Sequence, residues 1–133
     1  MQNAAAKLIL RKRRRDSASG ALRQLHWLRI DARITFKVLL LAHKILRGKC
    51  SENLQLQYKQ FNGRPDNYLL LDTPNFKTAY GKRVFAYNAS RLWNALPVDV
   101  RAEEDTEKFK KKLKTVLFER HDELWWKAFK YTL

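Results

Sequence analysis

The chain has little cysteine, and it has no long apolar run. Cys50 is the single cysteine among 133 residues, so an internal disulfide is excluded and a reducing compartment is favoured. No apolar run reaches the roughly 18 residues that a membrane-spanning helix needs. The short apolar stretch Ala4–Leu10 precedes the basic residues, which is the reverse of the order in a secretory signal. We therefore expect an intracellular protein, nuclear or cytoplasmic, that is neither secreted nor held in a membrane.

Acidic residues are also scarce. The chain has 13 Asp and Glu against 28 Lys and Arg, a formal net charge of +15. The excess is uneven, because residues 1–50 hold 13 Lys and Arg against only Asp16 and Asp31, a net charge of +11. A chain this basic favours polyanionic partners or acidic surfaces. The asymmetry predicts that the contact lies in the N-terminal third.

The composition is that of a folded chain. Hydrophobic residues make up 45% and aromatic residues 12%, which is too rich for intrinsic disorder. The length favours a single domain, residues 1–133, with a modest core. Within it we distinguish a basic helical part at 1–49, an irregular linker or hairpin at 50–79, a C-terminal block at 80–120 and an aromatic tail at 121–133.

Three long segments have helical patterns, besides two short helical segments expected at Ala21–Leu28 and Ala89–Ala95. Met1–Arg15 is rich in Ala and Leu and contains neither Gly nor Pro, and its second half is a run of cations. Ala32–Arg47 carries apolar residues every three or four positions, and Gly48 follows it. Glu107–Arg120 repeats the same spacing at the C-terminal side. The chain is therefore expected to be mainly α.

Two short segments favour strands. Tyr68–Leu71 and Val84–Tyr87 are rich in aromatic and aliphatic residues, and turn-forming residues punctuate the chain between them. Asn62–Asp66 is expected to be a turn. The predicted fold is a small, mainly α domain with room for a short β-hairpin near residues 68–87.

Four sequence blocks occur in an order that resembles a known family. The most informative is Tyr80–Arg101, which contains Tyr-Gly-Lys-Arg-Val-Phe followed by Leu-Trp-Asn-Ala-Leu-Pro. The run resembles the C-terminal part of the open reading frame that encodes reverse transcriptase in non-LTR (LINE-type) retrotransposons. The other matching blocks are Gln2–Ile9, then Leu25–Leu28 with Arg33–Lys37, and finally Phe109–Phe118.

The resemblance implies a role in holding nucleic acid. It makes residues 1–49 similar to the helical thumb that follows the palm and tracks the primer–template duplex. The polymerase core with its metal-binding aspartates would lie upstream of these blocks. We therefore expect a non-catalytic fragment of an RNA-directed DNA polymerase that binds RNA, DNA or an RNA–DNA hybrid without sequence specificity.

The residues themselves give no sign of catalysis, of a metal site or of a cofactor. Nucleotidyl transfer needs carboxylates that hold two metal ions, and no Asp-Asp pair occurs. His26, His43, His121 and Cys50 are the only soft metal ligands, and their spacing matches no zinc pattern. The acidic run Glu103–Asp105 precedes the last predicted helix, where it suits capping and compensation of the helix dipole.

The candidate binding residues are cations of the N-terminal third. A dense strip ends the first predicted helix, and three cations of the next helix share one face because they are four and seven residues apart. Contacts of this kind neutralise phosphates without reading sequence. A solvated charged face or a nuclear-localisation-like run is the alternative. The candidates are Lys7, Arg11, Lys12, Arg13, Arg14, Arg15, Arg33, Lys37 and Lys44.

Three further interpretations stay open at this point. The chain could be a degenerate transposon remnant with no selected function, or a basic amphipathic module for anionic membrane surfaces. Self-association could use the Ala4, Ala5 and Leu8 face or the tail that holds Trp125 and Trp126. The lysines of the last predicted helix, from Lys108 to Lys114, are interpreted as a solvated face, and the Leu-Trp-Asn-Ala-Leu-Pro block as structural.

Overall fold

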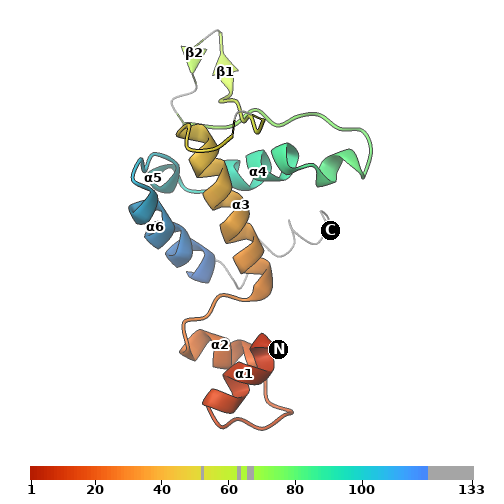
Figure 1. Cartoon of the computed structure of the whole chain (residues 1–133), viewed down its shortest axis with the longest axis vertical. Helices are drawn as coiled ribbons and strands as arrows, with labels where there is room; N and C mark the ends of the chain where they lie inside the picture. Colours follow the sequence, from red (N-terminus) through yellow and green to blue (C-terminus); the bar gives the residue numbers. More distant parts are fainter. Residues whose placement is uncertain (52, 63, 66–67, 120–133) are drawn as a thin grey trace.

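The chain is mainly helical, as the sequence predicts. A computed structural model describes residues 1–51, 53–62, 64–65 and 68–119. Two short helices lie at one end, a long helix runs through the centre, and the remaining helices pack along it (Figure 1). The helices are α1 (Gln2–Ile9), α2 (Ala18–Gln24), α3 (Ile30–Leu46), α4 (Phe85–Asn94), α5 (Val98–Arg101) and α6 (Thr106–Glu119), with a 3-10 turn η1 (Gly81–Arg83) before α4.

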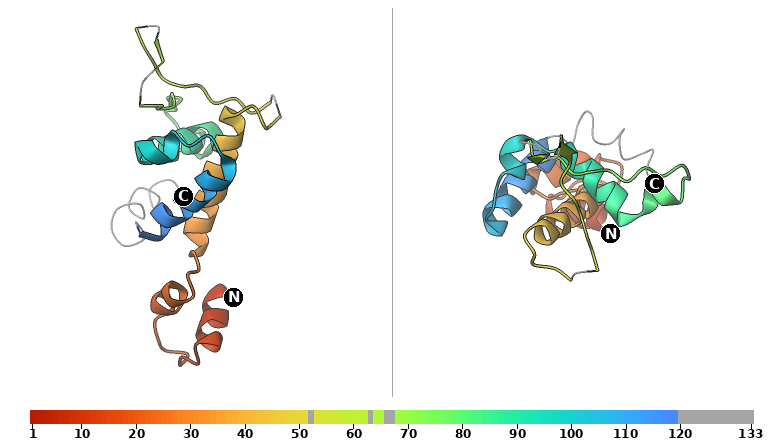
Figure 2. Two further views of the ribbon diagram at one scale, coloured as in Figure 1. Left: turned by 90° about the vertical axis from the view of Figure 1, so that its left-hand side faces the viewer. Right: turned by 90° about the horizontal axis from the view of Figure 1, so that it is seen from above.

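The apolar residues form two separate clusters. α1 and α2, here called the N-terminal lobe, bury only Ala6, Ala21 and Leu22. α3 to α6, here called the main lobe, bury a larger set that includes Trp93 and Phe109. Figure 2 shows the N-terminal lobe below the main lobe, joined to it by the segment between α2 and α3. Most of the hydrophobic stabilisation therefore resides in the main lobe.

The buried face of α3 is not centred on its most apolar residues, but is shifted by about one position along the sequence. Thr35, Leu39, Ala42 and His43 are buried, whereas Ile34 is exposed. The two polar members can turn inward because each makes a hydrogen bond. The Thr35 hydroxyl donates to a backbone carbonyl one turn earlier, and His43 Nε2 lies 2.9 Å from the carbonyl oxygen of Glu103.

His43 makes the stability of the main lobe depend on pH. Its ring stacks on Phe109 at 4.2 Å and is fully buried, so desolvation lowers its pKa below the ordinary 6.5. The unfolded chain then binds the proton more readily than the folded chain. The contribution of His43 to the free energy of unfolding is therefore fully present above about pH 6.5. It falls below that pH, by up to about 1.4 kcal/mol per pH unit.

A pair of denaturation series tests this pH dependence. Urea unfolding at pH 7.5 and at pH 5 should show a loss of stability at the lower pH. His43→Phe keeps a stacking ring but cannot titrate, so its loss should be smaller by the contribution of His43. An equal loss in both proteins would show that other groups control the pH dependence.

The Leu-Trp-Asn-Ala-Leu-Pro block is structural, and its contacts explain how. Trp93 Nε1 donates to the carbonyl oxygen of Leu69 at 3.0 Å. The Asn94 side chain pairs with the backbone of Leu71 twice, accepting at 2.7 Å and donating at 2.9 Å. Leu96 is buried in the main core. The block therefore fixes the irregular segment before α4 onto the helical core.

The β-hairpin predicted near residues 68–87 does not form, because Tyr68–Leu71 does not pair with Val84–Tyr87. The observed strands are β1 (Gln60–Phe61) and β2 (Arg64–Pro65), an antiparallel pair, and an isolated bridge joins Tyr58 to Leu71. The predicted strand Val84–Tyr87 instead begins α4 after an extended Val84. Apolar residues of α4 recur at helical spacing, and their burial favours helix there over strand propensity.

Gly81 fits where a side chain would collide. It is buried, and a Cβ there would lie 2.7 Å from the Cβ of Phe76. We expect Gly81→Ala to lower the free energy of unfolding by about 1–3 kcal/mol through this overpacking. Gly20→Ala is the control, because a Cβ there meets nothing closer than 3.7 Å and alanine favours helix by about 1 kcal/mol. Urea unfolding should give the highest free energy of unfolding for Gly20→Ala, an intermediate value for the wild type and the lowest value for Gly81→Ala.

Candidate nucleic-acid interface

The first helix ends earlier than predicted, and this changes how the basic residues are presented. The N–H of Arg11 donates to the carbonyl oxygen of Leu8, and the N–H of Lys12 donates to that of Lys7. These two bonds form the Schellman ending of a helix, with Arg11 in the left-handed region at φ 51°. The prediction of helix from Met1 to Arg15 is therefore wrong beyond Ile9.

The same ending closes three helices of the chain. Gly48 occupies the left-handed position after α3 at φ 66°, where glycine carries no steric cost. His26 occupies it after α2 and Arg11 after α1, at φ 52° and 51°. A side chain with a Cβ costs about 1–2 kcal/mol in this conformation. The absence of glycine at Arg11 is the reason that the pattern of the sequence hides the end of α1.

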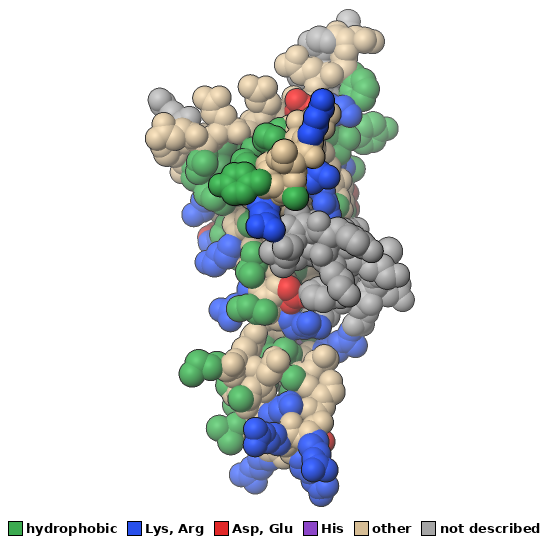
Figure 3. Space-filling model, turned by 90° about the vertical axis from the view of Figure 1, so that its right-hand side faces the viewer, with side chains coloured by type: hydrophobic (Ala, Val, Ile, Leu, Met, Phe, Trp, Pro, Cys, Tyr) green, Lys and Arg blue, Asp and Glu red, His purple; other side chains and the backbone are tan. Residues whose placement is uncertain are grey.

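The cations that follow form an exposed loop, here called the basic tip, residues Arg11–Arg15. The loop connects α1 to α2, and Figure 3 shows Lys and Arg side chains gathered at the lower end of the molecule. Lys7 Nζ donates to the carbonyl oxygen of Arg14 at 2.9 Å. Asp16, the only acidic residue among residues 1–30, accepts from the N–H of Arg13 at 2.8 Å. The tip is thus a charged loop tied back to both of its ends.

The cations predicted on α3 do not join the basic tip. Arg33 and Lys37 instead line a groove of about 770 Å³ where the two lobes meet. Lys114 of α6 lines the same groove, so it is not merely part of a solvated face. Lys44 does not line it. This groove is lined by Gln2, His26, Trp27, Leu28, Arg33, Phe36, Lys37 and Lys114.

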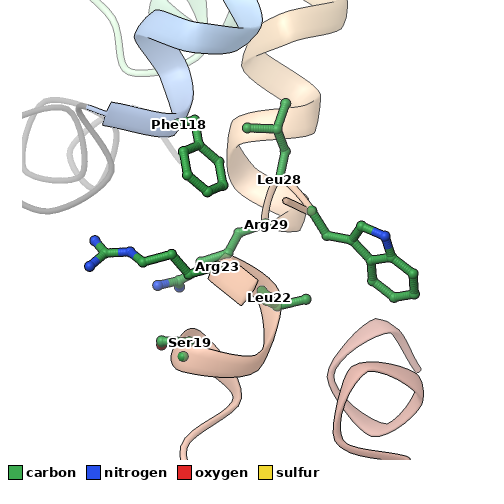
Figure 4. A pocket seen from close by; sticks show the side chains of 8 residues that line it. Ser19, Leu22, Arg23, Leu28, Arg29 and Phe118 are labelled. Atoms are coloured by element: carbon green, nitrogen blue, oxygen red, sulfur yellow. The ribbon is translucent and has the colours of Figure 1, made fainter. Parts of the chain in front are cut away.

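Specific contacts hold the two lobes together beside the groove. Gln2 Nε2 of α1 donates to the carbonyl oxygen of Leu28 at 2.7 Å. The ring of His26 stacks on Phe118 of α6, with centroids 5.4 Å apart. Figure 4 shows Phe118 reaching from α6 toward the segment that joins the lobes, over a smaller cavity of about 150 Å³. Residues distant in sequence therefore meet at this junction.

The acidic run before α6 serves the fold, as predicted. Asp105 Oδ1 accepts from the N–H of Glu107 at 2.9 Å, which caps the start of α6. Glu103 pairs with Lys112 at 2.7 Å, and this hydrogen bond lowers the pKa of the Glu103 carboxyl. Glu104 lies 3.5 Å from Arg47. In the described part of the chain, no three His, Cys, Asp or Glu side chains gather as metal ligands.

The apolar face suggested for self-association is exposed. Ala4 and Ala5 are exposed, and Leu8 has 80% of its surface open to solvent. Self-association through this face stays a prediction. Trp125 and Trp126 lie outside the residues that the structure describes. No helix in the described ranges is long and apolar enough to cross a bilayer.

Comparison with known proteins adds no relative to this picture. No protein-family model, no curated protein and no solved structure matches the chain. The resemblance to the reverse transcriptase region therefore rests on the sequence blocks alone.

Sequence reasoning missed the groove. In the sequence, Trp27 belongs to the same short block as His26, and Lys114 is one of several lysines in the last helix. Neither residue has a local pattern that indicates a site, because the groove depends on how α3 and α6 pack against the N-terminal lobe. The available signal in the sequence is Trp27, an aromatic residue in the break between the helix that ends at Gln24 and the helix that begins at Ile30.

Proposed function

We propose that the chain is a non-catalytic nucleic-acid-binding fragment, similar to the thumb and post-palm region of a non-LTR reverse transcriptase. It binds RNA, DNA or their hybrid through phosphates, without reading sequence. The observation that carries the proposal is the basic tip. Its five consecutive cations, all exposed except the half-buried Lys12, occupy one loop, with Asp16 as the only acidic group nearby in sequence. A cationic surface of this kind neutralises backbone phosphates and releases their counterions, which gives affinity without reading sequence.

The conformation of the tip supports this role. Because α1 ends at Ile9, the five cations are gathered in one short loop and are not distributed along a helix. Lys7 anchors the loop by its bond to the Arg14 carbonyl, so part of the ordering cost of the loop is met before the partner binds. The wide, shallow minor groove of an RNA-containing duplex is recognised by shape and backbone contacts of this sort.

The test is equilibrium binding of labelled nucleic acid, followed by fluorescence anisotropy. An RNA–DNA hybrid and a DNA duplex, each in two unrelated sequences, should all bind at low salt. Affinities for the two sequences of each kind should agree, because phosphate contacts carry no sequence information. A flat binding curve at low salt would reject the function, and a strong preference for one sequence would reject its mechanism.

A second candidate is a peripheral module for anionic membranes. It is favoured by the exposure of Leu8 and Ile9 beside the basic tip, since apolar side chains next to cations suit a lipid interface. Flotation with vesicles that contain phosphatidylserine tests it. Leu8→Ser with Ile9→Ser should abolish flotation under this alternative and leave nucleic-acid binding unchanged under the first.

A further inference from the structure

The groove combines aromatic and cationic side chains. Arg33 and Lys37 come from α3, and Lys114 comes from α6. None of the described residues that line the groove is acidic, so the cations face no neutralising carboxylate in its wall. A volume of about 770 Å³ lies within the range of sites that bind small organic groups.

Trp27 is the distinctive member of this groove. It remains 36% exposed, although a residue of its size is usually well buried. The turn that ends α2 fixes its backbone, because the N–H of Trp27 donates to the carbonyl oxygen of Leu22 at 2.9 Å and His26 before it is left-handed. The stacking of His26 on Phe118 holds this turn against α6. The indole is thus positioned at the junction of the lobes.

We propose that the groove binds an unpaired nucleotide, with its base stacked on Trp27 and its neighbouring phosphates held by Arg33, Lys37 and Lys114. This rests on the proposed function and deepens it, because it names a single-stranded segment as the ligand of a second site. Cationic grooves with aromatic platforms bind single strands in this way, since every base has a π-face. The basic tip binds backbone, whereas the groove detects whether bases are available for stacking.

The distinguishing experiment removes bases and keeps phosphates. A labelled single-stranded oligonucleotide is compared, by anisotropy, with an abasic strand of the same length and charge. The wild-type protein should bind the strand with bases about 10-fold more tightly or better. Trp27→Leu should lose this preference while still binding both strands. Tyr80→Leu is the matched control, because Tyr80 is 82% exposed and does not line the groove, and it should keep the preference.

A charge variant separates the contribution of phosphate binding from that of base stacking. Lys37→Ala with Lys114→Ala should weaken binding of both strands by a similar factor and reduce the salt dependence of each. Equal binding of the two strands by the wild-type protein would overturn the groove proposal while leaving phosphate binding intact. A preference that survives in Trp27→Leu would also overturn it. Failure of every oligonucleotide and duplex to bind would overturn the proposed function as well.

Discussion

Replacing Trp93 with Ala is expected to unfold the main lobe or bring it close to unfolding. Trp93 is 1% exposed, stacks on Phe109 at 5.9 Å and donates its indole N–H to Leu69. Removing a buried tryptophan costs about 3–5 kcal/mol, out of a total stability of about 5–15 kcal/mol for a typical domain. The substitution also leaves the Leu69 carbonyl without its partner and releases the segment before α4.

Urea unfolding followed by circular dichroism measures this loss. Val98→Ala is the control, because Val98 is exposed and its replacement should change stability by no more than about 0.5 kcal/mol. A loss below about 1 kcal/mol in Trp93→Ala would contradict the packing described here. A wild-type chain that melts without cooperativity would instead favour the interpretation as a degenerate remnant.

Replacing the five residues of the basic tip with Ala is expected to remove most of the affinity for duplex nucleic acid. Five phosphate contacts give a salt slope of about −4.5 on B-form DNA. Such contacts lose about 500-fold in affinity between 50 and 200 mM salt, so the wild-type curve should be steep. The variant should bind weakly and show a slope smaller by several units.

The matched control loses the same charge elsewhere. Both variants lower the net charge by five, from +15 to +10, so a difference between them reports position and not total charge. The control should keep most of the affinity and of the salt slope. Equal losses in the two variants would show that the chain binds through its overall charge. The control replaces Lys77, Lys82, Arg83, Lys108 and Lys111, all exposed and outside the groove.

The sequence predicts where α3 and α6 lie, because both carry apolar residues at helical spacing, although the buried face of α3 is displaced from its most apolar residues. The last helix and its capping by the acidic run are as expected, and so is the structural role of the Leu-Trp-Asn-Ala-Leu-Pro block, in which Trp93 is buried. These features depend on residues close together in the chain. The bond from Trp93 to Leu69 was beyond prediction, since nothing local indicates which carbonyl the indole would meet.

The sequence predicts the site only in part. It identified the cations of the basic tip, but it placed them on a helix because Arg11 occupies a left-handed position where glycine is the usual signal. Helical periodicity predicts that Arg33 and Lys44 share one face of a helix. It does not indicate what that face contacts. Lys114 reaches the groove from α6, an approach that only tertiary packing determines.

Chemical footprinting of the wild-type complex tests the role of the basic tip most directly. Arginine-selective labelling with phenylglyoxal, read by mass spectrometry, compares the free protein with its complex with an RNA–DNA hybrid. We expect labelling of Arg13, Arg14 and Arg15 to fall on binding, while labelling of the exposed Arg83 stays constant. Unchanged labelling of the tip in a protein that still binds, or equal protection of Arg83, would contradict phosphate binding by this loop.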